Sequence, residues 1–478
     1  MTHAPAASPA SFFSALDQAP MTWRHYALWL AASGGAFLDG FSVVALGLSL
    51  PLLKHEFTLS PLLIGLMGSA LVLGAAASAW LGGLLADKIG RKRVLMLDMA
   101  VIAIASALGA FAPDPWLLVP AQFLTGVGVG ADFPTSASYV SEMMPRAMRS
   151  RMTVATIAMQ SVGMFAAAVV GLAVTTLYPE TRDWRLLLGA VGVLAIIFLL
   201  ARMRAPESVR WLATKGRIEE ARALLVLLRR EFDEKPASAL AQAAPVAALI
   251  AAAPPSTSSG AGLGTLFSPR FREQTLLVSL PWMLMDVATY GVGLFTPVIL
   301  GALHFGGDGT GPVAADFADA EGSALVDLFL LVGFLASLWA VPALGRIPMQ
   351  IAGFFGMAVG MALLLFAAVA NDGANAHMGF IIAGFVLFNF SMNVGPNATT
   401  FILAPALFPT AVRASASGFA AGAAKVGATF GTFVAPQLQA AWGLDGVVAL
   451  MTLVSLAGLA ATAWFAHAVN DEGALEED

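Results

Sequence analysis

GLLADKIGRKR, residues 83–93, is a short cation-rich stretch that joins two long apolar segments, 60–86 and 93–112. Gly90 predicts a tight turn, and the Lys and Arg residues around it suit the phosphate headgroups at the cytoplasmic face of a bilayer. Asp87 is expected to cap or pair near a neighbouring helix end. A positive-inside loop with a helix stop explains the composition as well as a dedicated motif does. In either case the two flanks predict a pair of membrane-spanning helices.

Apolar segments of similar length recur along the whole chain. Apolar residues make up 58% of the sequence and charged residues 12%, with a mean hydropathy of +0.79. A hydrocarbon core about 30 Å thick needs about 20 apolar residues per helix. The segments lie at 25–53, 60–86, 93–112, 115–141, 152–178, 185–203, 276–303, 323–343, 349–371, 377–405, 412–438 and 445–468. The sequence therefore predicts an all-α polytopic membrane protein with twelve transmembrane helices.

A polar stretch divides these segments into two sets of six. It opens with a predicted amphipathic helix, Pro206 to Phe232, and continues as the flexible run AAAPPSTSSGAG. Six segments on each side of one linker are typical of a two-bundle transporter with a central cavity. The predicted parts are an N-terminal tail 1–22, a bundle 23–203, a linker 204–275, a bundle 276–468 and a C-terminal tail 469–478.

Lys and Arg predict the orientation in the membrane. They gather in 88–93, 146–151 and 202–272, whereas the loops on the other side hold only Lys54, Arg182 and Arg185. Since cytoplasmic loops carry the cations, both termini are expected in the cytoplasm. The loop 304–322 has acids and no Lys or Arg, which suits the outer face. No cleaved signal peptide is expected, and the predicted location is a bacterial inner membrane.

Composition also excludes several classes of protein. The chain has no cysteine, its six histidines lack metal-ligand spacing, and no GxxxxGK[ST] run is present to hold ATP. No nucleophile–base pair stands out, and a net charge of −5 gives no basic surface for nucleic acid. We therefore expect no enzyme, metal, cofactor or nucleic-acid partner. The expected partners are a small solute, protons and the lipid bilayer, with the protein a monomer.

Ionisable residues inside the apolar segments are the strongest functional signal. Intramembrane charges are costly and mark substrate or proton pathways by default. A carboxyl group holds its proton more tightly in an apolar setting and less tightly beside a cation. An acid that exchanges these settings as the protein changes conformation could couple protons to transport; a fixed ion pair that only holds helices together is the alternative. The candidates are Asp39, Asp132, Asp286 and Lys425, whereas Asp98 and Asp327 lie nearer helix ends and are expected at the interface.

The glycine run before Asp132 predicts close helix packing rather than a nucleotide site. Gly126, Gly128 and Gly130 have no preceding soluble strand, and small residues at this spacing let membrane helices approach one another. Phe133 and Pro134 follow, and they predict a break near the middle of this helix.

A charged gate is predicted at the cytoplasmic end of the first half. Glu142 precedes Arg149 and Arg151, and an acid facing these cations could open and close as the bundles rock; ordinary loop charges are the alternative. The second half has Ala406 and Arg413 at the matching place. Its equivalent of the 83–93 stretch, Val341 to Arg346, keeps Gly-Arg but has Pro342 at the acid position.

The spacing in 83–93 resembles the loop signature of the major facilitator superfamily, and further motifs are similar to its phosphate:proton symporters. These are GADFP (130–134), AMQ (158–160), WMLMDVATYGVGL (282–294), NVGPNATTFI (393–402) and AAKVGA (423–428). PESVRWL (206–212) resembles instead a sugar-porter signature, with a structural role expected. The resemblance implies the major facilitator fold, two six-helix bundles around a central cavity.

The resemblance also implies roles for individual residues. A substrate site is implied at Gln160, Trp282, Asp286, Tyr290, Asn397 and Phe133; proton coupling at Asp39 and Asp132, with Lys425 as counter-charge; and a cytoplasmic motif and gate at Gly83, Asp87, Gly90, Arg91, Glu142, Arg149 and Arg413. Three positions depart from the pattern. Phe133 replaces a Tyr, Gln122 replaces an Arg that would act on Asp132, and Ser42 stands where a second acid is common.

The predicted function is proton-coupled symport of a small, polar, anionic solute by alternating access. Inorganic phosphate is the best single candidate, and sugars, organic or aromatic acids and other metabolites are the alternatives. A facilitator that moves no proton and a transport-inactive sensor are the other classes; the intact intramembrane acids weigh against the sensor.

Overall fold

The structure, a computed structural model, describes residues 20–177, 181–217, 219–221, 223–224, 263–293, 296, 312–369, 378–408 and 410–469. The side chains of Asp87, Arg413 and residues 312–327 lie outside this description. So do most of the predicted tails and the linker from 225 to 262. The predicted part boundaries therefore stay predictions.

The first half is a bundle of long helices. They are α2 (Trp23–Ala32), α3 (Gly34–Glu56), α4 (Pro61–Ile89), α5 (Arg91–Ala110), α6 (Leu118–Met143), α7 (Arg146–Leu177) and α8 (Trp184–Arg204). The first predicted segment is divided at Ser33, where α2 ends and α3 begins. Short 3₁₀ turns, η1 (Pro115–Leu117) and η2 (Thr181–Asp183), precede α6 and α8.

The second half is a similar bundle. Its elements are η4 (Leu263–Phe267), α12 (Arg272–Gly293), α14 (Pro312–Leu344), α15 (Arg346–Val369), α16 (Met378–Met392), η6 (Asn393–Asn397), α17 (Ala398–Leu407), α18 (Thr410–Phe465) and η7 (Ala466–Val469). α18 contains two predicted segments. They are two helices joined at a bend at Gly443, where φ is 73°. α14 begins at Pro312, so the predicted loop 304–322 is wrong in its second part.

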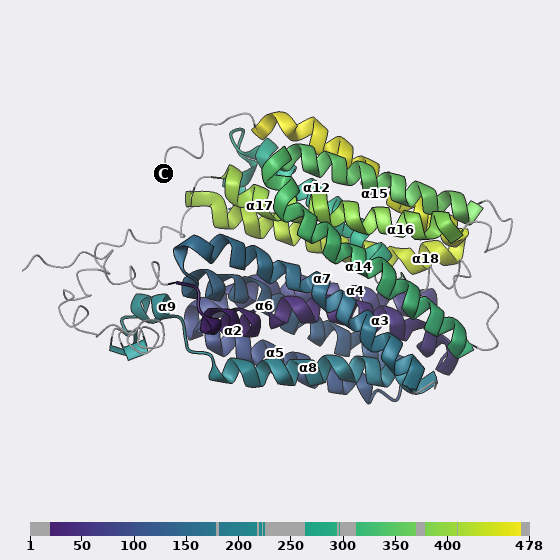
Figure 1. Cartoon of the computed structure of the whole chain (residues 1–478), viewed down its shortest axis with the longest axis horizontal. Helices are drawn as coiled ribbons and strands as arrows, with labels where there is room; N and C mark the ends of the chain where they lie inside the picture. Colours follow the sequence, from purple (N-terminus) through teal and green to yellow (C-terminus); the bar gives the residue numbers. More distant parts are fainter. Residues whose placement is uncertain are drawn as a thin grey trace, which may run out of the picture.

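The two bundles lie side by side with their helices roughly parallel (Figure 1). α4 packs against α18 and α7 packs against α14, so these four helices form most of the contact between the halves; α3 adds smaller contacts with α12 and α14. α9 (Val209–Thr214) lies beyond one end of the N-terminal bundle, the end at which α2 begins (Figure 1). Polar side chains on α3, α7, α12 and α18 can therefore meet between the bundles.

The outer surface is apolar, as a lipid-facing surface must be. Large side chains that are mostly exposed include Phe111, Trp339, Trp442 and Trp464. Ten helices in the described part of the chain are long and apolar enough to cross a membrane, one of them the bent 416–465 stretch. A shorter apolar helix, Leu328–Leu344, lies within α14. The all-α membrane fold is confirmed, while the count of twelve crossings stays a prediction.

The predicted break near the middle of the helix that contains Pro134 is wrong. α6 continues through Pro134 without a break. Thr135 and Ser138 donate to carbonyl groups one turn earlier, which adds local hydrogen bonds around the proline. The irregular turn lies instead at Asn393–Asn397, a π-helical turn that contains Pro396. Wide turns of this kind are frequent at functional sites.

The predicted helix from Pro206 to Phe232 is also wrong as a single element. α9 ends at Thr214, and Gly216 follows in the left-handed region with φ of 71°. Ser208 begins α9 by accepting a hydrogen bond from the Trp211 amide. Residues 219–221 and 223–224 are helical again, and the stretch from 225 lies outside the described residues.

Candidate functional site

A polar cluster lies between the two bundles and draws on both of them. Gln160 Nε2 on α7 donates to Asp39 Oδ2 on α3 at 2.8 Å and lies 3.3 Å from the Tyr290 hydroxyl on α12. Lys425 Nζ on α18 donates to the same hydroxyl at 2.7 Å. Its ammonium group also lies 4.7 Å from the centre of the Tyr290 ring. We call these residues, with Asp286, the central cluster.

Close helix packing explains why Asp39 and Gln160 meet. Gly40 faces the backbone carbonyl of Gln160 at a distance that leaves no room for a side chain. α3 and α7 therefore touch at this level, and the neighbouring Asp39 is brought against the Gln160 amide. The sequence predicted the charge of Asp39, but only the resemblance pointed to Gln160.

Asp286 adds a second carboxyl group to the central cluster. It precedes Tyr290 by one turn of α12, is buried, and interacts electrostatically with Lys425 and Asp39. The described part of the cluster thus contains two carboxyl groups and one ammonium group. An intramembrane cluster with an excess of acid is a place where a proton or a cation is favoured.

Three aromatic side chains from the two bundles contact one another. Phe401 of α17 meets Phe133 of α6 with ring centres 6.3 Å apart and Trp282 of α12 with ring centres 6.1 Å apart. Both contacts are edge-on, the preferred geometry for aromatic pairs. Phe133 and Trp282 were predicted for the substrate site, whereas Phe401 was not singled out.

Asn397 lies in the π-helical turn. Its amide donates to Asn393 Oδ1 at 2.7 Å, and Asn393 in turn donates to the backbone carbonyl of Asn389 at 3.3 Å. The turn packs against α12, α14 and α15. The predicted contact of Asn397 with solute stays a prediction.

Asp132 has a different partner from the one predicted. Its carboxylate lies 2.5 Å from Arg202 Nη1 of α8, and Asp98 of α5 lies 2.9 Å from the same nitrogen. All three side chains are inside the N-terminal bundle, with exposures of 0% for Asp132, 2% for Asp98 and 1% for Arg202. Lys425 was expected as the counter-charge of both Asp39 and Asp132; it interacts electrostatically with Asp39, whereas Asp132 pairs with Arg202 instead.

Two further expectations about these residues are wrong. Asp98 is buried inside the bundle rather than exposed at the interface. Asp132 has a cation partner, although Gln122 stands where the family has an arginine. Arg202 supplies that cation from another helix. It was counted with the cytoplasmic linker because it lies near the end of its apolar segment. The available signal was a cation within the segment 185–203, at a depth similar to Asp98.

The 83–93 stretch forms a compact polar junction with the start of the linker. Arg91 lies 3.0 Å from Glu142, and the Glu207 carboxylate accepts the backbone amides of Arg91 at 3.0 Å and Lys92 at 3.2 Å. An acid at these amides satisfies the free donors at the start of α5. Ser208 donates to Glu142. Gly83, which lies near Pro134, completes the contact of α4 with α6.

This junction joins α4, α5 and α6 to the residues that lead into α9, all on the N-terminal side of the chain. The gate roles of Glu142, Arg149 and Arg413 stay predictions, and the Arg413 side chain lies outside the described residues. The sugar-porter-like stretch 206–212 has a clear structural part in the junction, through Glu207 and Ser208.

Comparison with known proteins identifies the family. Residues 22–471 match the family described as "Sugar (and other) transporter". The chain belongs to this family. It is a multi-pass integral membrane transporter of the major facilitator superfamily and not an enzyme.

The transporter resembles relatives of several kinds. It is 28% identical over 448 residues to a putative metabolite transport protein, YaaU, of Escherichia coli K12, covering 93% of this chain and 91% of the relative. It is also 28% identical over 465 residues to a probable inorganic phosphate transporter 1-8 of Oryza sativa subsp. japonica, covering 88% and 83%. The xylose transporter XylE from E. coli, in a partially occluded inward-open conformation, has the same fold with a TM-score of 0.71, 20% identity, and coverage of 92% and 97%.

Gly90 of the transporter sets the geometry of the junction, and we expect Gly90→Ala to lower its stability. Gly90 has φ of 108°, and an added methyl group would meet the Glu207 carboxylate. The expected loss is about 1–3 kcal/mol, measured as a lower thermal unfolding temperature in detergent. Gly189→Ala in α8 is the control, because a methyl group there meets only ordinary contacts. Equal unfolding temperatures for the two variants would contradict the argument.

Proposed function

We propose that this transporter is a proton-coupled symporter of a small anionic solute, with inorganic phosphate as the first candidate. The supporting observation is the central cluster, in which Asp39 and Gln160 of one bundle meet Tyr290 and Lys425 of the other. A contact of this kind has to change when the bundles rock, so the binding of protons and solute can be linked to access.

The charge of the central cluster favours joint entry of a proton and an anion. With Asp39 and Asp286 ionised and Lys425 charged, the cluster has one excess negative charge. An anion entering a buried site of that charge would be repelled. Protonation of one carboxyl group removes the repulsion and provides an additional hydrogen-bond donor. Proton binding therefore raises the affinity for an anion, which is the thermodynamic requirement of symport.

The donors of the cluster suit an oxyanion. The ammonium group of Lys425 and the amide of Gln160 each lie within hydrogen-bonding distance of the Tyr290 hydroxyl. Charge-assisted hydrogen bonds of this type are the stronger class in proteins. The similarity to a probable phosphate transporter of rice supports phosphate within this class.

A second candidate is a solute with a ring, such as a sugar or an aromatic acid. The observation that favours it is the edge-on group of Phe133, Phe401 and Trp282, which offers apolar ring surface contributed by both bundles. Fewer hydroxyl donors, with Phe133 in place of a tyrosine, also suit a less charged solute. The similarity in fold to a xylose transporter is compatible with this candidate but shows the fold alone.

Uptake into proteoliposomes tests the proposal. The purified transporter is reconstituted, a pH gradient is imposed, and uptake of radiolabelled phosphate, xylose, a benzoate-type acid and a dicarboxylate is followed. We expect phosphate to accumulate, and a protonophore to remove the accumulation. Accumulation that survives the protonophore would refute proton coupling, and uptake of xylose or an aromatic acid without phosphate would establish the second candidate.

Tyr290→Phe is expected to weaken phosphate binding about tenfold, the effect of losing a hydrogen bond of roughly 1.4 kcal/mol. The hydroxyl group joins Lys425 to Gln160, so its loss separates the two donors. The dissociation constant of phosphate is measured by microscale thermophoresis with labelled protein in detergent. Tyr26→Phe, at a half-exposed position of α2, is the control. An unchanged dissociation constant for Tyr290→Phe would remove Tyr290 from the site.

A further inference from the structure

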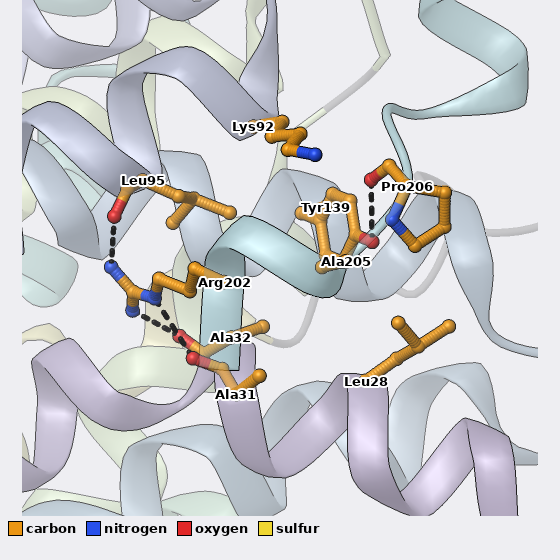
Figure 2. Close-up of a pocket in the computed structure, with 9 residues that line it drawn as sticks. All are labelled: Leu28, Ala31, Ala32, Lys92, Leu95, Tyr139, Arg202, Ala205 and Pro206. Carbon is orange, nitrogen blue, oxygen red and sulfur yellow. Dashed lines mark hydrogen bonds between the residues drawn. The ribbon is translucent and has the colours of Figure 1, made fainter. Parts of the chain in front are cut away.

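The Nη1 group of Arg202 has too few hydrogens for the oxygens that it faces. Its Nη1 group carries two hydrogens but faces three oxygens: Leu95 O at 2.7 Å, Asp98 Oδ1 at 2.9 Å and Asp132 Oδ2 at 2.5 Å. The remaining nitrogens are engaged as well, because Nε donates to Ala31 O and Nη2 to Ala32 O, each at 2.8 Å. Figure 2 shows the guanidinium group reaching both α2 and α5.

The helix break at Ser33 explains why Arg202 donates hydrogen bonds to the end of α2. The last carbonyl groups of a helix have no partner within it, and a cation at that end is favourable. Ala31 and Ala32 are the last residues of α2, and both direct their carbonyl groups to Arg202. Arg202 therefore caps α2 while it faces two carboxyl groups.

Each of the two carboxyl groups has an oxygen atom without a donor. Asp98 and Asp132 lie within hydrogen-bonding reach of each other, and Asp98 Oδ2 and Asp132 Oδ1 are buried without a hydrogen-bond partner among the described residues. Ionised carboxylates only accept hydrogen bonds, so neither can satisfy the other. Two ionised carboxylates beside one guanidinium group also leave an excess negative charge in a buried position. A single proton on the pair would correct both deficits.

The other charged and titratable groups around this site are few in the described chain. Tyr139 of α6 lies on its cytoplasmic side and donates to Pro206 O at 2.9 Å; beyond Tyr139 are Glu142 and Glu207. Lys92 of α5 lines the same small pocket, with its ammonium group on Met203 O at 2.9 Å. On the side of α3, Gly35 packs directly on the Asp132 carboxyl group.

We propose that Asp98, Asp132 and Arg202 form a proton-binding site inside the N-terminal bundle, in which the two carboxyl groups share one proton. The site is separate from the central cluster and needs no solute. It binds a proton because the proton supplies the missing donor and removes the excess charge. Asp98 and Asp132 hold the proton, and Arg202 is a positioning residue that fixes both of them against α2.

The position of this site suggests its role in transport, a role that rests on the proposed function. Gly35 touches Asp132, and Asp39 of the central cluster follows Gly35 by one turn on the same face of α3. On the other side, Arg202 lines a small pocket together with Leu28, Lys92, Tyr139 and Pro206 (Figure 2), and Pro206 shortly precedes α9. The pair thus lies between the central cluster and the predicted cytoplasmic face, where a proton leaving Asp39 would be received.

Infrared difference spectroscopy of the purified protein in detergent, without solute, tests the site. The absorption of protonated carboxyl groups is compared between neutral and alkaline pH. We expect Asp98→Asn and Asp132→Asn each to lose the signal of one protonated carboxyl group, because the remaining carboxylate then forms a simple ion pair with Arg202. Asp39→Asn is the comparison, and it should retain this signal. The exposed variant Asp445→Asn controls for the loss of any aspartate.

The site is overturned if both Asp98→Asn and Asp132→Asn keep the full signal. Arg202→Lys is a further variant, in which both carboxyl groups and the cation remain. It should therefore retain the infrared signal of the protonated carboxyl group. The role in transport is read separately, as phosphate accumulation driven by a pH gradient in proteoliposomes. If Asp98→Asn loses the infrared signal but still accumulates phosphate, the proton-binding site is supported and its role in transport is refuted. Absent phosphate accumulation in the wild type refutes the proposed function and leaves the infrared result to decide the site.

Discussion

Lys425→Met is expected to abolish the accumulation of phosphate against its gradient in proteoliposomes. Among the described residues of the central cluster, Lys425 is the only cation, and it faces both Asp39 and Asp286. Without it, a buried anion loses its main electrostatic partner, and two carboxyl groups are left with no cation. Removing one partner of a buried charged group costs about 3–5 kcal/mol, and even 3 kcal/mol would reduce affinity more than about 100-fold.

The measurement compares uptake driven by a pH gradient with exchange at equal pH on both sides. Lys425→Met should lose both, because it removes solute binding as well as coupling. Lys425→Arg retains the charge and should keep exchange, although the larger group disturbs its contact with the Tyr290 hydroxyl. Lys215→Met, at an exposed position after α9, is the matched control for loss of a lysine. Normal accumulation by Lys425→Met would exclude the central cluster as the solute site.

The main architecture could be predicted because its cause is local. Apolar segments of the length of a bilayer define the helices, and the polar stretch between them divides the chain into two halves. Details that depend on tertiary packing could not be predicted. Pro134 suggested a broken helix, yet α6 is continuous, and the irregular turn falls at Asn393–Asn397. The start of α14 at Pro312 was likewise hidden by the polar composition of the preceding stretch.

The candidate site shows the same division. Asp39, Asp132, Asp286 and Lys425 could be recognised one by one, since a charge inside an apolar segment is visible in the sequence. Which of them meet could not be recognised. Two acids pair with Lys425 between the bundles, while Asp132 joins Asp98 on Arg202 within one bundle. Pairing depends on the relative rotation and depth of helices, and a single sequence contains no direct record of either.

Arg202→Met is expected to cause the largest loss of stability among single substitutions in the N-terminal bundle. The guanidinium group holds two buried carboxyl groups and caps the carbonyl groups of Ala31 and Ala32. Methionine fills much of the same volume but provides no donor and no charge. Breaking a buried ion pair on one side costs about 3–5 kcal/mol. The change is measured as the free energy of unfolding in mixed micelles, with the exposed variant Arg204→Met as control.

The triple variant Arg202→Met, Asp98→Asn, Asp132→Asn separates charge from packing. If the loss in Arg202→Met comes from two uncompensated carboxyl groups, then removing both charges should restore at least about 2 kcal/mol, because neutral replacements of buried ion pairs are well tolerated. The asparagine amides can donate to each other, so the pair keeps a hydrogen bond. Should the triple variant be less stable than Arg202→Met alone, packing and the capping of α2 would be the dominant contribution of Arg202. The restored protein should still fail to accumulate phosphate, since neither amide can carry a proton.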